Sequence, residues 1–109
     1  MARQTERLTD FLAREYAIAA DGVAPAKRGY YGQTWRVDAG GHGYFVKIVA
    51  LRSHQPVYRR SFPVIEHLNG RGVDFISKIV KASDGRLWAD YGGATLGVFE
   101  WIDGANVQN

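Results

Sequence analysis

The sequence predicts an α+β domain with a mainly antiparallel sheet, and three observations support this fold class. Apolar residues recur at helical spacing near the start of the chain. Short runs rich in aromatic and β-branched residues follow, and glycine-rich turns bound them. A second helix-like segment then separates these runs into two groups. The 109 residues suit one domain with one core.

The first helix is expected before residue 22. Its apolar side chains recur at helical spacing with mostly charged residues between them, as in a surface helix that covers a sheet. These side chains are Leu8, Phe11, Leu12 and Tyr16. Asp21 and Gly22 then supply the turn chemistry that ends the segment.

Three strands are expected next, in a stretch that glycines divide into short runs. Residues 33–38 and 44–49 have strand composition, and the glycine-rich connection over residues 38–43 predicts a tight hairpin between them. Residues 26–31, which run into Gly29, supply the first strand. The predicted order up to this point is one helix followed by three strands.

A second helix is expected over about residues 55–69. Pro56 is compatible with its first turn. Pro63 would remove a backbone hydrogen bond inside a helix, so the alternative is a start near Ser61 that places Pro63 in the first turn. The glycine-containing stretch 69–72 ends the segment.

The last third of the chain is expected to return to strands. Residues 76–82 and 86–90 flank the Ser-Asp-Gly stretch at 83–85, which is a strong turn signal. Residues 95–102 form a final apolar strand that ends in an Asp-Gly pair. The sequence thus predicts helix, three strands, helix, and two or three further strands.

Composition excludes several classes of protein. With no cysteine, the chain has neither disulfides nor thiolate metal sites, which fits a cytoplasmic location. No segment is apolar enough to span a membrane, and the first residues lack the apolar run of a secretion signal. The net charge of +3 is too small and dispersed for a nucleic-acid interface. The three histidines lack the spacing of metal ligands. We therefore expect no nucleic-acid or membrane partner.

Two features indicate a site for a phosphate-bearing ligand, and each also has a plain structural explanation. The first is a glycine-containing stretch whose backbone N–H groups can approach a ligand closely. It consists of Gly29, Tyr30, Tyr31, Gly32, Gln33 and Thr34. The second is Lys47, which lies within an apolar strand where an ammonium group is costly to bury without a partner. The alternatives are an ordinary turn for the stretch and a solvated strand face for Lys47.

The order of these features resembles the N-terminal lobe of the aminoglycoside phosphotransferase and choline kinase superfamily. A glycine hairpin, a strand lysine, a helix and a terminal apolar strand follow one another over roughly residues 5–109. Within this superfamily, residues 62–104 look most like the spectinomycin phosphotransferase group. The stretches that carry this likeness are residues 66–72, residues 83–88 and residues 99–104.

The resemblance implies a fold and a set of roles. The fold is a curled antiparallel sheet of about five strands, with an N-terminal helix and a helix after the third strand. Lys47 would bind the α- and β-phosphates of ATP or GTP, and the stretch 29–34 would cover the phosphates. Phe99 would be the gatekeeper residue at the hinge, where the backbone of Glu100 and Ile102 would contact the adenine.

A helix glutamate pairs with the strand lysine in kinase-like folds, and Glu66 is the candidate here. Relatives often place that glutamate near the positions of Ser61 or Arg59, more than a helical turn earlier. Either the helix is offset in this chain, or Glu66 does not pair with Lys47. The spacing leaves both possibilities open.

The resemblance also predicts what the chain lacks. It implies a helix over residues 1–22, a nucleotide-binding lobe over residues 23–104, and the start of a linker over residues 105–109. The His-x-Asp loop and the magnesium ligands belong to a C-terminal lobe, and neither motif occurs in this sequence. We therefore expect an inactive fragment that binds nucleotide weakly or not at all. It is also expected to self-associate through the surface that would face that lobe.

Alternatives remain for the function. Relatives with similar N-terminal lobes transfer the phosphoryl group to choline, homoserine, a sugar, an aminoglycoside-type antibiotic or a protein hydroxyl, and the residues that choose the acceptor lie mostly outside this chain. A small α+β binding or interaction domain without a nucleotide role is the alternative from another class. It would explain the glycines as turns and Lys47 as a solvated residue.

Overall fold

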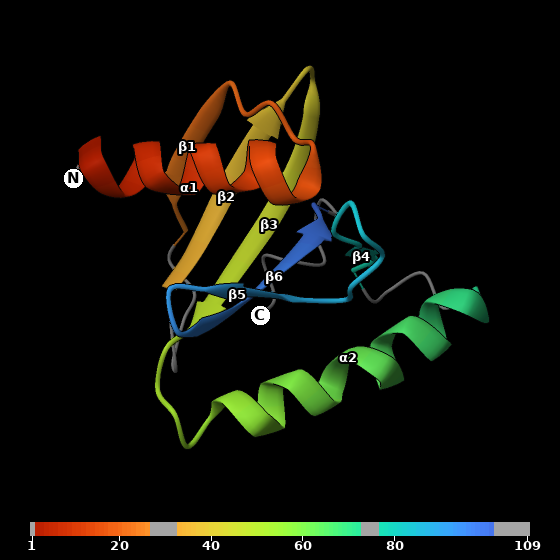
Figure 1. Ribbon diagram of the computed structural model, residues 1–109. Helices are drawn as coiled ribbons and strands as arrows, with labels where there is room; N and C mark the ends of the chain where they lie inside the picture. The colour runs from red at the N-terminus through yellow and green to blue at the C-terminus, as the bar shows by residue number, and fades with distance from the viewer. Residues whose placement is uncertain (1, 27–32, 73–76, 102–109) are drawn as a thin grey trace.

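The computed structural model of the chain describes residues 2–26, 33–72 and 77–101. These residues form two helices and a six-stranded antiparallel sheet (Figure 1). The elements are α1 (Ala2–Tyr16), β1 (Gly22–Pro25), β2 (Gln33–Ala39), β3 (His42–Val49), α2 (Gln55–Gly70), β4 (Ile79–Val80), β5 (Ala89–Tyr91) and β6 (Ala94–Glu100). The predicted order of helices and strands is confirmed, but the strands expected over 76–82 and 86–90 are shorter, and each pairs with β6 and not with the other.

The sheet runs in the order β1-β2-β3-β6-β4, and β5 also pairs with β6. The short strands β4 and β5 share one edge of β6: β4 pairs with Val98 and Phe99, and β5 pairs with Ala94 to Leu96. The sheet therefore has five positions across its width although it contains six strands, in agreement with the predicted sheet of about five strands.

The β2–β3 hairpin forms as the glycines predict. Ala39 pairs with His42, so the loop contains only Gly40 and Gly41. Both have positive φ, 57° and 81°, as a two-residue type I′ turn requires. This turn fixes the register that places Lys47 opposite Thr34.

Helix α1 ends earlier than the sequence suggests, at Tyr16 instead of the Asp21-Gly22 pair. Ala17 adopts a positive φ of 56°, and the Ile18 N–H donates to the Leu12 carbonyl at 3.1 Å. The helix thus ends at a residue of positive φ, a position that glycine usually occupies and that alanine occupies here. The predicted first strand is also displaced: β1 occupies Gly22–Pro25, while residues 27–31 lie outside the described part of the chain.

Helix α2 begins at Gln55 and contains Pro63 in its interior, so the predicted alternative start near Ser61 is wrong. Pro56 lies in the first turn, as expected. The Gln55 amide group explains the early start, because it donates to the carbonyls of Ala50 and Gly93, both at 3.0 Å. These two bonds, of which the one to Gly93 is long-range, secure the first turn and offset the backbone bond that Pro63 lacks.

The two helices pack on opposite faces of the sheet. Along β6, Leu96 and Val98 belong to the core cluster that contains the buried residues of α1. Gly97 and Phe99 alternate with them and meet Phe62 of α2, since strand residues alternate between faces. Every residue of β6 from Ala94 to Phe99 is buried. The central strand therefore couples the two faces. No helix in the described ranges is long and apolar enough to cross a membrane.

Candidate functional site

Lys47 lies in the middle of β3, on the sheet face that α2 covers. Its register partners are Thr34 on β2 and Gly97 on β6, and paired residues share a face. The alternating residues Val46 and Ile48 point to the α1 core. Lys47 is half-buried.

The nearest described partner of the Lys47 ammonium group is the ring of Tyr58 on α2. The Lys47 Nζ lies 5.3 Å from the ring centroid, within the range of a cation–π contact. The Tyr58 hydroxyl donates to the backbone carbonyl of Lys47 at 3.1 Å. Burial raises the pKa of Tyr58 well above its ordinary value, so the phenol is neutral at physiological pH.

Glu66 does not pair with Lys47. Its carboxylate forms an ion pair with Lys81 at 2.7 Å, on a partly exposed surface. Within the described residues, Lys47 makes no ion pair shorter than 4 Å. The reason is the position of Glu66 along α2: Tyr58 and Phe62, which lie on the same side of the helix, occupy the positions that face Lys47 and Gly97. Glu66 is one turn further along, beside the end of β4.

The positions where relatives place their glutamate hold other contacts. Ser61 donates its hydroxyl to the Tyr58 carbonyl at 2.6 Å, within the helix. The Arg59 side chain donates to Thr95 Oγ1 at 2.8 Å and lies over the Trp88 ring at 4.2 Å. Glu66 is the one acidic residue of α2, so this helix places no carboxylate beside Lys47.

An aromatic cluster extends from Lys47 toward the end of β6. Phe45, two residues before Lys47, has its ring centroid 6.3 Å from that of Phe99 and 6.1 Å from that of Trp101. Phe99 stacks on Phe62 at 5.7 Å, and Arg36 lies over Trp101 at 4.2 Å. Phe45 and Trp101 are partly exposed, so this surface presents flat apolar rings beside a cation.

The predicted hinge residues fall partly within the described chain. Phe99 is buried at 7% exposure. The Glu100 N–H donates to the Lys78 carbonyl at 2.9 Å, and the Trp101 N–H donates to Gly43 at 3.0 Å. A ligand at Glu100 or Trp101 would therefore have to use a carbonyl, because these two N–H groups are already bonded. Ile102 lies outside the described residues.

The predicted phosphate-covering stretch is described only at its end. Gly29, Tyr30, Tyr31 and Gly32 lie outside the described residues. Thr34 donates its hydroxyl to the Ala26 carbonyl at 3.1 Å, and the Ala26 N–H donates to the Thr34 carbonyl at 2.8 Å, which closes the base of the stretch. Gln33 is placed on the opposite face from Lys47, since it pairs with Ile48 of the α1 core. Its side chain therefore does not approach Lys47.

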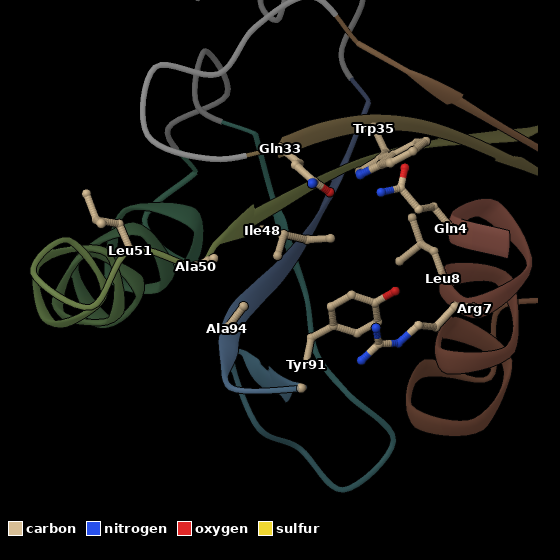
Figure 2. A pocket seen from close by; sticks show the side chains of 11 residues that line it. Gln4, Arg7, Leu8, Gln33, Trp35, Ile48, Ala50, Leu51, Tyr91 and Ala94 are labelled. Carbon is tan, nitrogen blue, oxygen red and sulfur yellow. The ribbon is translucent and has the colours of Figure 1, made fainter. Parts of the chain in front are cut away.

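A cavity of about 270 Å³ lies beside α1 (Figure 2), and Lys47 is not among the residues that line it. Its walls come from α1, the start of β2, the end of β3 and the β5–β6 turn. Arg7 lies over the Tyr91 ring at 5.0 Å on one side. The indole N–H of Trp35 is buried without an acceptor among the described residues. Elements that are distant along the chain assemble this cavity, so no local pattern of residues predicts it.

No metal site is evident in the described ranges, where no group of three histidine or carboxylate residues is close enough to hold an ion.

This sheet, with a helix on each face and a lysine in the third strand of its main path, has the fold of a kinase-like N-terminal lobe. The fold class predicted from the sequence is confirmed.

Solved structures of phosphotransferases share this fold. Spectinomycin phosphotransferase APH(9)-Ia in complex with ADP and spectinomycin superposes with a TM-score of 0.75 at 16% identity, over 90% of this chain and 29% of that one. Its AMP-bound complex gives 0.69 at 16%, over 90% and 28%. An aminoglycoside phosphotransferase from Alicyclobacillus acidocaldarius gives 0.54 at 19%, over 83% and 25%.

The comparisons confirm at the level of fold the resemblance to aminoglycoside phosphotransferases that the sequence indicated. The chain spans less than a third of the length of these enzymes. No protein-family model and no curated protein matches the sequence.

Proposed function

We propose that this chain is the nucleotide-binding lobe of a kinase-like phosphotransferase, in which Lys47 binds the phosphates of ATP or GTP. The supporting observation is the position of Lys47: it has no carboxylate partner in the described structure and lies beside a row of aromatic rings. An ammonium group beside flat apolar rings matches the two chemical parts of a nucleotide, an anionic phosphate chain and a stacking base.

The described residues near Lys47 offer groups that suit a nucleotide. Phe45 and Trp101 offer ring faces, and the Glu100 carbonyl offers an acceptor for an exocyclic amino group. The described residues contain no cluster of metal ligands. In the proposed enzyme, the magnesium ligands and the aspartate that orients the acceptor hydroxyl belong to a C-terminal lobe. The bound nucleotide supplies the γ-phosphoryl group for transfer.

The acceptor that we propose is a hydroxyl group of a small molecule such as an aminoglycoside-type antibiotic. Its support is the structural likeness to spectinomycin and aminoglycoside phosphotransferases. The likeness covers 25–29% of those chains.

A titration of the ¹⁵N-labelled chain with ADP tests the proposal. We expect amide shifts to concentrate at Lys47, Thr34 and Phe99 to Trp101, with a dissociation constant near the millimolar range because only one side of a cleft is present. Lys47→Ala should weaken binding at least tenfold. Lys78→Ala is the matched control, because Lys78 is an exposed lysine beside β4, and it should bind ADP as the unaltered chain does.

Two results would contradict nucleotide binding at Lys47. One is an unchanged affinity in Lys47→Ala. The other is a set of amide shifts centred on the α1 cavity, at Gln33, Trp35 and Tyr91, instead of on the α2 face.

A further inference from the structure

We propose that Tyr58 positions Lys47 in place of a helix carboxylate. This proposal rests on the proposed function of Lys47 as the residue that binds the phosphates. A lysine within an apolar strand needs a partner that compensates its charge and limits its rotamers. The partner in this chain is the Tyr58 ring face, 5.3 Å from Nζ. The acidic residue of α2 is engaged elsewhere, because Glu66 pairs with Lys81.

The Tyr58 ring is itself held on three sides. Its hydroxyl donates to the Lys47 carbonyl, so one side chain contacts both the backbone and the ammonium group of the same residue. Phe62 meets the ring in an edge contact with centroids 4.9 Å apart. The absence of a side chain at Gly97 leaves the room that both rings occupy. The ring cannot turn away without breaking these contacts.

A buried polar network fixes the face that α2 presents. The Thr95 hydroxyl donates to Gln55 Oε1 at 2.8 Å, and Arg59 donates to both residues, at 2.8 Å to Thr95 and 3.1 Å to Gln55. Thr95 is fully buried on β6, so the network anchors the first two turns of the helix to the sheet centre. Tyr58 is adjacent to Arg59 in this anchored part, which holds the ring above Lys47.

A neutral ring and a carboxylate affect a phosphate differently. A carboxylate beside Lys47 would offset much of its charge and compete with an arriving phosphate for the ammonium group. The ring face attracts the cation but adds no net negative charge. Tyr58 thus orients Lys47 while leaving its full charge to the ligand. Its loss should increase the mobility of Lys47 and weaken phosphate binding by about three- to tenfold.

The first experiment observes Lys47 without any nucleotide. Reductive methylation with ¹³C-formaldehyde labels the four lysines, and Lys47→Arg identifies the Lys47 signal. We expect a ring-shifted signal with nuclear Overhauser contacts to the Tyr58 ring protons. Tyr58→Leu should move this signal to the position of an exposed lysine, whereas Tyr58→Phe, which keeps the ring, should retain most of the shift.

Two further variants make the assignment specific. Tyr91→Leu is the matched control, because Tyr91 forms a cation–π contact with Arg7 on the other sheet face and its loss should leave the Lys47 signal unchanged. Glu66→Gln should move the Lys81 signal alone. If Tyr58→Leu does not fold, the Overhauser contacts in the unaltered chain decide the matter, and their absence overturns the proposal.

The second experiment measures ADP affinity in the same variants. Tyr58→Leu should weaken binding about three- to tenfold, Tyr58→Phe less, and Tyr91→Leu not at all. A Lys47 signal that responds to Glu66→Gln as strongly as to Tyr58→Leu would overturn the positioning role. If the Lys47 signal moves in Tyr58→Leu but Lys47→Ala leaves ADP affinity unchanged, the proposed function fails. Tyr58 would then position Lys47 without serving phosphate binding.

Discussion

Replacement of Gly97 by alanine tests the contact between α2 and β6 on which the Lys47 site depends. A Cβ atom at residue 97 would lie 2.5 Å from Phe62 Cζ and 2.6 Å from Tyr58 Oη, far inside normal contact distance. Phe62 has no exposed surface and stacks on Phe99, so its ring has little space into which it can move. The added methyl group must therefore push α2 away from the sheet.

The expected cost is large for a single methyl group. Overpacking of a filled core costs about 1–3 kcal/mol, and we expect about 3 kcal/mol because two rings are displaced at once. For a chain of this size, that loss lowers the melting temperature by roughly 10–15 °C. The higher strand propensity of alanine offsets less than about 1 kcal/mol of the cost.

Urea denaturation followed by tryptophan fluorescence measures this loss. Gly22→Ala is the matched control, since Gly22 also lies in a strand and a Cβ there meets nothing within 4 Å. The control should keep the stability of the unaltered chain within about 0.5 kcal/mol. A Gly97→Ala variant as stable as the control would refute the close packing of Tyr58 and Phe62 against β6.

Two further substitutions test the helix α1 end. Tyr16→Phe removes a buried hydroxyl that has no acceptor in the described structure, so stability at pH 7 should be unchanged or higher by up to about 1 kcal/mol. Burial raises the pKa of Tyr16 from 10.0 to about 12, so the unaltered chain should lose up to about 3 kcal/mol between pH 10 and 12, where only the unfolded phenol ionises. Denaturation at each pH should show a smaller alkaline loss in the variant, and an equal loss would contradict this burial. Ala17→Gly should stabilise the chain by about 0.5–1 kcal/mol, since Ala17 has a φ of 56°, and a lower melting temperature would argue against that backbone conformation.

The sequence predicted those parts of the fold that depend on residues close together along the chain. Gly40 and Gly41 specify the hairpin turn, and the strands on either side have the composition that the structure confirms. Lys47 was expected on a strand of this hairpin, and it lies there. The short strands were less predictable, because β4 has only two residues and exists by pairing with β6.

Long-range contacts decided what the sequence left open. The start of α2 depends on Gln55 bonding to Gly93, 38 residues away. The partner of Glu66 depends on where α2 lies along the sheet, and the Thr95 network ties the first turns of the helix to β6. Residue spacing along the helix contains no information about such a contact. For that reason spacing gave no answer on the Lys47–Glu66 pair.

The buried strand β6 explains how one short segment supports both faces of the domain. Leu96 and Val98 fill the α1 core, while Gly97 and Phe99 on the other face receive the rings of α2. A larger residue at position 97 would separate α2 from the sheet and remove the Tyr58 ring from Lys47. Because Gly97 has no side chain, α2 lies close enough to the sheet for the Tyr58 ring to contact Lys47, although this helix has no acidic residue at that point. In the proposed enzyme, the orientation of Lys47 would depend on the packing of α2 against β6 more than on an ion pair.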